Sequence, residues 1–191
     1  MELIFATGNK HKLAEAQFIL GGSIPDIKLL PHNGPDPVES GTSFLENALI
    51  KARAAFKATG QAAFADDSGI SVEVMGGAPG IFSAIWAGGR GDAINRQLLL
   101  DQLIDIPMEN RAASFVCTIA LVEESGETFF TGVWPGSIAM AASGDQGFGY
   151  DPVFIPEGFM VTAAELEPDL KSSYSHRATA MNQMASFLFS R

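Results

Sequence analysis

The sequence predicts an α/β protein built on a mixed β-sheet, and two patterns carry this prediction. In the N-terminal third of the chain, short apolar runs alternate with segments of helical periodicity, which is typical of strands joined by helices. In the middle of the chain, two long apolar segments flank Ser125-Gly126, which predicts an antiparallel hairpin. A sheet that holds both arrangements is mixed.

The N-terminal third contains the clearest single helix. Residues 43–60 have a helical pattern in which Ser43 is a good N-cap and Glu46 completes a capping-box pattern. Gly60 is placed to end this helix. Ahead of it, the sequence predicts a strand at 3–7, a helix at 12–20, a strand at 27–31 and a Pro/Gly-rich loop at 31–42.

The rest of the chain is predicted to combine strands, loops and closing helices. Its expected elements are, in order, a strand, polar turn and strand within 62–75, a turn at 76–80, a helix at 91–103, the hairpin, and a Gly-rich loop at 143–152. The last helix is expected to begin near Ser175. No repeat, linker or change of composition divides the sequence, so residues 1–191 are predicted to form a single domain.

Composition narrows the class of protein. A hydrophobic content of 47% and a charged content of 18% fit a globular core and not a disordered chain. The net charge of -10 argues against a protein that coats nucleic acid, but it permits a small anion held by a few cations and a metal. Cys117 is the only cysteine, so no disulfide can form within the chain. We see no signal peptide and no apolar run near the roughly 20 residues of a membrane span, so no membrane partner and a cytoplasmic location are expected.

The segment TGNKHK places cations where a helix is expected to begin. Free backbone N–H groups at a helix start, after a glycine turn, suit a phosphate. Lysines there oppose the helix dipole unless an anion is bound. The pattern is neither a P-loop nor a dinucleotide fingerprint, and a surface turn with solvated lysines is the alternative. The candidate phosphate-binding residues are Thr7, Gly8, Asn9, Lys10, His11 and Lys12.

Asp66 and Asp67 form a second candidate site, after an apolar strand. Adjacent carboxylates repel each other unless a cation lies beside them. If strand geometry persists, the two side chains face opposite sides, so only one faces a given ligand and the other braces the loop or holds a second cation. Mg²⁺ suits such carboxylates together with substrate phosphates. The alternative is an Asx-type turn before Gly69.

Glu39 and the helix that follows it form a third candidate. Asn47 and Lys51 are four residues apart and therefore share one helix face, with Arg53 close by. Glu39 precedes this helix in the Pro/Gly-rich loop. The alternative is a solvated loop acid and a solvated helix face.

The last two candidates lie in the C-terminal third. In the segment GFGYDP, glycines bracket an aromatic ring, so Phe148 or Tyr150 can stack on a base; the alternative is an aromatic anchor. Further on, His176 and Arg177 lie at an expected helix start, where cations are favourable only if they face a ligand. Six of the twelve Lys and Arg residues lie in or beside these five stretches, which favours convergence on one polyanion: Lys10, Lys12, Lys51, Arg53, Lys171 and Arg177.

These motifs occur in a familiar order. The segments TGNKHK, SFLENALIKARA, ADDSGISVEVMGGAPGIFSA, FGYDPVF and SHRATAM together resemble the Ham1/RdgB-like inosine triphosphate pyrophosphatase family over nearly the whole chain. The resemblance implies an elongated mixed sheet flanked by helices, in two lobes around a central cleft. It also implies Mg²⁺-dependent hydrolysis of ITP, dITP and XTP to the monophosphate and pyrophosphate by a homodimer.

The resemblance also assigns roles to residues. The family's phosphate-binding loop falls on residues 7–12, its metal-binding glutamate on Glu39 and its helix lysine on Lys51. Its catalytic aspartate, a proton acceptor and metal ligand, falls on Asp67, and a substrate-binding serine falls on Ser68. The remaining substrate-binding positions, with the base-reading pair last, fall on Phe148, Gly149, Tyr150, Asp151, Lys171, His176 and Arg177.

Three other functions compete with this one. A Maf-like nucleotide pyrophosphatase of other base preference is disfavoured by the His176-Arg177 pair and by FGYDP. A non-enzymatic nucleotide-binding module does not need Glu39 and Asp67 together. A HAD-type phosphatase needs the motif D-x-D after a strand, which ADDSG does not supply.

Overall fold

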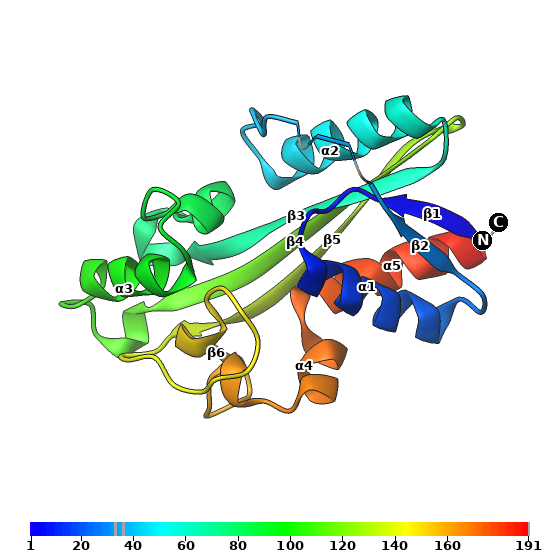
Figure 1. Ribbon diagram of the computed structural model, residues 1–191. Coiled ribbons are helices and arrows are strands. Elements are labelled where there is room, and N and C mark those ends of the chain that lie inside the picture. Colours follow the sequence, from blue (N-terminus) through cyan, green and yellow to red (C-terminus); the bar gives the residue numbers. More distant parts are fainter. Residues whose placement is uncertain (33, 36, 191) are drawn as a thin grey trace. The chain divides into compact units, whose positions relative to one another are not determined.

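The computed structural model describes residues 1–190 except Asn33 and Asp36, and it also leaves out the side chain of His11. Six strands form one sheet in the order β2-β1-β3-β4-β5-β6 (Figure 1). β1 pairs in parallel with both β2 and β3, whereas β5 pairs with β6 in the antiparallel sense. The predicted α/β fold with a mixed sheet is therefore confirmed. The strands are β1 (Glu2–Phe5), β2 (Lys28–Pro31), β3 (Ala63–Val72), β4 (Ala112–Glu123), β5 (Gly126–Ile138) and β6 (Phe154–Pro156).

Five α-helices and five short 3-10 helices join the strands in the described part of the chain. The α-helices are α1 (Lys10–Ser23), α2 (Phe44–Thr59), α3 (Asp92–Gln102), α4 (Pro168–Tyr174) and α5 (His176–Phe189). The 3-10 helices are η1 (Glu73–Met75), η2 (Gly80–Ile85), η3 (Met108–Asn110), η4 (Asp151–Val153) and η5 (Ala163–Glu165). Among the described residues, no helix combines the length and the apolar character needed to cross a membrane.

The chain divides into two compact units. Unit 1 comprises Met1–Asp67, Cys117–Gly132 and His176–Arg191, and unit 2 comprises Ser68–Val116 and Val133–Ser175. The chain passes from one unit to the other four times, so neither unit is a continuous segment.

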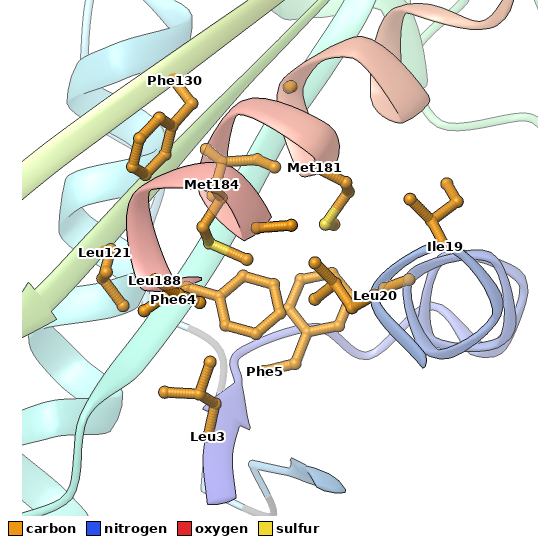
Figure 2. Packing of buried hydrophobic residues seen from close by; sticks show 14 of the residues in the cluster. Leu3, Phe5, Ile19, Leu20, Phe64, Leu121, Phe130, Met181, Met184 and Leu188 are labelled. Carbon is orange, nitrogen blue, oxygen red and sulfur yellow. The ribbon is translucent and has the colours of Figure 1, made fainter. Parts of the chain in front are cut away.

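One face of the unit 1 sheet packs against α1 and α5, which lie side by side (Figure 1). Phe5 of β1 and Phe64 of β3 stack with their ring centroids 4.4 Å apart. Figure 2 shows these rings close to Leu20 of α1 and Met181 of α5. Because strand residues alternate between faces, Asp66 lies on the same face as Phe64 and therefore points toward α1 and α5.

The opposite face of the unit 1 sheet packs against α2. Ala48, Ala52 and Ala55 recur at helical spacing and are fully buried, and they pack with Ala63 and Ala65 of β3. Small side chains on both elements let the helix backbone approach the sheet closely. Asp67 follows Ala63 and Ala65 at strand spacing, so it points toward α2.

The predicted caps of α2 are largely confirmed. Ser43 Oγ accepts a hydrogen bond from the Glu46 N–H at 3.2 Å, and Gly60 ends the helix in the left-handed conformation at φ 67°. The capping-box prediction is wrong in one detail. The Glu46 carboxylate accepts hydrogen bonds from the backbone and hydroxyl of Thr42 and not from the backbone of Ser43.

Unit 2 has its own core, in which α3 and the 3-10 helices η1, η4 and η5 pack on the remaining parts of the long strands. Phe154 of β6 lies edge-on to Phe115 and Trp134, with ring centroids 4.7 and 5.5 Å away. Arg111 is buried just ahead of β4, and its guanidinium donates to the carbonyl oxygens of Leu103, Ile106 and Ala139. This buried arginine ties the end of α3 to the segment that follows β5.

Candidate functional site

Asp66 and Asp67 lie in the middle of the continuous ten-residue strand β3. The prediction of a strand, polar turn and strand for this segment is therefore wrong, and so is the Asx-turn alternative. The strand can carry both carboxylates because each of them has a cationic partner. Gly69 permits close packing: an added Cβ there would clash with the Gly80 carbonyl oxygen and the Ser83 hydroxyl.

Asp66 faces two cations on the α1/α5 side of the sheet. Its Oδ2 atom lies 2.9 Å from Lys12 Nζ and 3.4 Å from Arg177 Nη2, and its side chain is almost fully enclosed. Burial alone would raise the pKa of Asp66, but Lys12 and Arg177 outweigh it and hold the pKa well below its ordinary value. Asp66 is therefore an anion that braces two cations, one of the two roles the sequence left open for it.

Glu15 is a member of this group that the sequence analysis missed. Its carboxylate forms an ion pair with Arg177 Nη1, so two carboxylates bracket the guanidinium of Arg177. Glu15 is three residues after Lys12 and hence on the same face of α1, which is the signal that points to it. Burial alone would lower the pKa of Arg177, but the anions around it raise the pKa above its ordinary value.

Asp67 faces α2 and meets a different cation. Lys51 Nζ lies 3.5 Å from Asp67 Oδ1 and 2.7 Å from Glu39 Oε1, so two carboxylates converge on one ammonium group. Asn47 Nδ2 donates to Asp67 Oδ2 at 3.2 Å, while Asn47 Oδ1 accepts from the Gly41 N–H. The Asn47 side chain thus ties the loop that carries Glu39 to β3.

The electrostatic environment of Asp67 differs from that of Asp66. Burial raises the pKa of Asp67 above its ordinary value, with Glu39 adding to the effect and Lys51 opposing it. For Lys51, burial alone would lower the pKa, but the carboxylates around it raise the pKa above its ordinary value. We refer to these seven side chains as the unit 1 charge cluster: Lys12, Glu15, Glu39, Lys51, Asp66, Asp67 and Arg177.

The cluster suits a divalent cation only with help from a ligand. Carboxylate oxygens are the donors that Mg²⁺ prefers, and Glu39 and Asp67 already converge on the positive charge of Lys51. Within the described residues, no group of three or more His, Cys, Asp or Glu side chains forms a metal site. Mg²⁺ commonly takes one or two carboxylates and completes its shell with substrate phosphates and water. The donor set fits that mode of binding.

The TGNKHK segment forms the start of α1, which begins at Lys10 and not at Lys12 as predicted. Asn9 acts as its N-cap, because Asn9 Oδ1 accepts from the Lys12 N–H at 3.3 Å. Thr7 Oγ1 accepts in turn from the Asn9 N–H at 3.2 Å. Gly8 and Lys10 are exposed, whereas Lys12 reaches Asp66. The predicted role of the His11 side chain lies outside the described residues.

Some of the predicted cations are not members of this cluster. Arg53 forms a bidentate pair with Glu127, both hydrogen bonds being 2.7 Å, and both side chains are exposed. Lys171 belongs to unit 2. His176 is buried in the first turn of α5, which packs so closely on β5 that a Cβ added to Gly132 would clash with the His176 carbonyl oxygen. Ser68 follows Asp67 in β3.

The loop at 147–151 in unit 2 contains four of the predicted residues, and a fifth, Lys171, contacts it. Asp151 Oδ2 accepts from the Phe148 N–H at 2.8 Å and from Lys171 Nζ at 2.6 Å. Lys171 Nζ also lies 5.4 Å from the centre of the Phe148 ring. Tyr150 is buried and donates its hydroxyl to the Ser83 carbonyl oxygen at 2.8 Å. Tyr150 thus has the contacts of an anchor, which leaves the half-buried Phe148 as the candidate for stacking on a base.

Comparisons with known proteins agree with one another. The model of the Ham1 family matches residues 3–187. A dITP/XTP pyrophosphatase of Leifsonia xyli subsp. xyli is 56% identical over 182 residues, covering 94% of this chain and 92% of that protein. A dITP/XTP pyrophosphatase of Mycobacterium tuberculosis is 48% identical over 190 residues, covering 94% and 91%. A solved Ham1 protein of Coxiella burnetii has a TM-score of 0.92 and 41% identity, and both chains are covered completely.

Proposed function

This chain belongs to the Ham1 family, and from that premise we propose that it is a nucleoside triphosphate pyrophosphatase. It hydrolyses the non-canonical purine nucleotides ITP, dITP and XTP to the monophosphate and pyrophosphate. One observation carries the proposal beyond the family: the two adjacent carboxylates on β3 face opposite sides of the sheet, and each has a cationic partner there. Asp66 pairs with Lys12 and Arg177 on one side, and Asp67 pairs with Lys51 on the other. Such an arrangement suits a polyanionic substrate on an acidic protein.

Asp67 is the residue to which we assign the chemistry. Its carboxylate orients a water molecule toward the α-phosphorus; the new bond joins the water oxygen to that phosphorus, and the bond to the bridging oxygen of pyrophosphate breaks. The proton of the water passes to Asp67 and then to solvent. Burial raises the pKa of this carboxylate in the metal-free protein, whereas a bound Mg²⁺ would favour its charged form, so Asp67 acts mainly by orienting the water. Catalysis of this kind depends mainly on positioning and on charge stabilisation.

Glu39 and Asp67 are the residues that would hold Mg²⁺. When bound there, the ion would offset the negative charge of the phosphates. Lys51 lies between these two carboxylates and supplies a further positive charge to the same place. On the other face of β3, Asp66 keeps Lys12 oriented, and the exposed backbone at Gly8 and Lys10, where α1 begins, offers N–H groups to a phosphate.

Base selection rests on hydrogen-bond donors that face the 6-keto oxygen. ITP and XTP carry this oxygen where ATP carries an amino group. A protein donor that pairs with the keto oxygen therefore has no acceptor when ATP is bound. Sites of this kind discriminate by roughly 10⁴-fold or more. We assign the donors to His176, to Arg177 and to backbone N–H groups, and the stacking surface to Phe148 of unit 2. The bracketing of Arg177 by Glu15 and Asp66 keeps its guanidinium in a fixed orientation.

We extend the proposal to the setting of the enzyme. It acts as a homodimer in the cytoplasm, and its two units form a single domain through which the chain passes repeatedly. Its substrate is a small nucleotide and not a nucleic acid, in keeping with the net charge of -10.

A substrate panel tests the proposal. The purified protein is incubated with ITP, XTP, GTP and ATP, with and without Mg²⁺, and pyrophosphate and orthophosphate are measured separately. We expect Mg²⁺-dependent release of pyrophosphate from ITP and XTP, with a much lower kcat/KM for ATP. Release of orthophosphate, or equal kcat/KM for ATP and ITP, would contradict the assignment.

A further inference from the structure

Helix α3 holds both sides of one residue in the 147–151 loop. Asp92 Oδ2 accepts a hydrogen bond from the Gly149 N–H at 2.9 Å, and Arg96 Nη1 donates to the Gly149 carbonyl oxygen at 2.7 Å. Asp92 and Arg96 are four residues apart, so they lie on the same face of α3. All of these residues belong to unit 2.

The two contacts fix the backbone conformation of Gly149 as well as its position. The N–H belongs to the peptide plane shared with Phe148, and the carbonyl belongs to the next peptide plane, shared with Tyr150. Holding both planes fixes the two dihedral angles between them. Gly149 has a φ of 60°, in the left-handed region, and an unrestrained glycine visits many other conformations. The clamp therefore selects one loop conformation among several.

Helix α3 is well placed to act as a rigid support. Asn95 is buried, and its side chain accepts from the Ala87 N–H at 2.8 Å and donates to the Ala84 carbonyl oxygen at 3.0 Å. Leu99, one turn further along, is fully buried in the unit 2 core. The helix is thus held at two successive turns of one face, so Asp92 and Arg96 project from a fixed frame.

We propose that Asp92 and Arg96 are positioning residues that orient the Phe148 ring for the nucleoside and so contribute to base selectivity. The proposal rests on the proposed function, in which Phe148 stacks on the base. A loop that is ordered before binding loses less conformational entropy when the nucleotide arrives. Without the clamp, the nucleotide must order the loop itself, which weakens binding and lets the ring tilt to accept other bases.

Kinetics of matched variants test this role. Arg96→Met and Asp92→Ala each remove one contact, Arg96→Lys and Asp92→Asn are the conservative versions, and Gln97→Ala is a control on the exposed side of α3. We expect Arg96→Met and Asp92→Ala to raise KM for ITP by about tenfold or more, with kcat within about threefold of wild type. The ratio of kcat/KM for ITP to that for ATP should fall, and the conservative versions should recover part of both effects. Variants that match Gln97→Ala, or that lose kcat alone, would overturn the proposal.

Amide exchange separates this proposal from the function on which it rests. In the nucleotide-free protein, we expect the Gly149 N–H to exchange at least about tenfold faster in Asp92→Ala and Arg96→Met than in Gln97→Ala. Unchanged exchange would refute the clamp even if wild type hydrolyses ITP. Faster exchange in these two variants, together with a wild-type protein that leaves ITP intact, would support the clamp and refute the proposed function. If either truncated variant fails to fold, Asp92→Asn and Arg96→Lys decide by the same two measurements.

Discussion

Replacing Asp66 by Asn removes a buried negative charge from between two cations while it preserves the size of the side chain. Asp66 is 2% exposed and has Lys12 and Arg177 at 2.9 and 3.4 Å. Removal of one partner from a buried ion pair costs about 3–5 kcal/mol. Because Glu15 still pairs with Arg177, and because an amide oxygen can still accept a hydrogen bond, we expect the lower end, a loss of about 3 kcal/mol in the free energy of unfolding.

Urea unfolding at neutral pH, followed by circular dichroism, measures this loss. Glu127→Gln is the matched control, because it neutralises an equally close carboxylate whose partner, Arg53, is exposed. Exposed pairs of this kind contribute at most about 1 kcal/mol. If Asp66→Asn lost no more stability than Glu127→Gln, Lys12 and Arg177 would not depend on Asp66, and the reasoning would fail.

The stability difference between wild type and Asp66→Asn should also depend on pH, in a direction that the pKa of Asp66 determines. Lys12 and Arg177 outweigh burial and hold the folded-state pKa of Asp66 below its ordinary value. A carboxylate of this kind contributes stability above its unfolded pKa of about 4, and this contribution is lost as the pH falls further. The difference in stability between wild type and Asp66→Asn should therefore narrow from about pH 5 toward about pH 2. A constant difference over that range would contradict the assignment.

Four further predictions follow from the contacts described above. Asp67→Asn should lower kcat for ITP by at least roughly 10²-fold in a folded protein, and near-normal turnover in a steady-state assay would exclude the assigned role. Arg111→Met should cost about 2–4 kcal/mol in urea unfolding, since it removes the donor from three carbonyl oxygens, two of them in buried hydrogen bonds. A loss under about 1 kcal/mol would show that these oxygens find other partners. Gly147→Ala should cost about 1–3 kcal/mol by the same method, because φ is 76° and the added Cβ clashes with Asp151; unchanged stability would mean that the loop yields freely. Burial and the nearby Asp66 raise the pKa of the Cys117 thiol to about 12, so only on the order of 10⁻⁴ of this thiol is ionised at about pH 8. A thiol reagent should therefore modify Cys117 only after denaturation, and rapid labelling of the folded protein would contradict this.

Sequence patterns predicted the fold where local signals agree with tertiary structure. The hairpin of β4 and β5 turns at Glu124 and Ser125, next to the predicted turn, and α2 has both of the caps expected for it. These features depend on residues close together in the chain. Periodicity and capping residues describe such features well.

The errors occur where distant residues decide the structure. Two adjacent aspartates are typical of a turn, yet β3 runs through Asp66 and Asp67 because α1, α2 and α5 supply their counter-ions. Those cations are far away in the sequence, so no local window contains them. Glu15 was missed for the same reason, since its partner Arg177 follows 162 positions later. Charge pairing across elements can override local propensity.

The central claim is that water directed by Asp67 attacks the α-phosphorus of a non-canonical purine triphosphate. Hydrolysis of ITP in water enriched in ¹⁸O, with mass spectrometry of both products, tests it most directly. We predict that one ¹⁸O atom enters IMP and that the released pyrophosphate carries none. Label in the pyrophosphate, or release of labelled orthophosphate, would place the attack at another phosphorus and contradict the account.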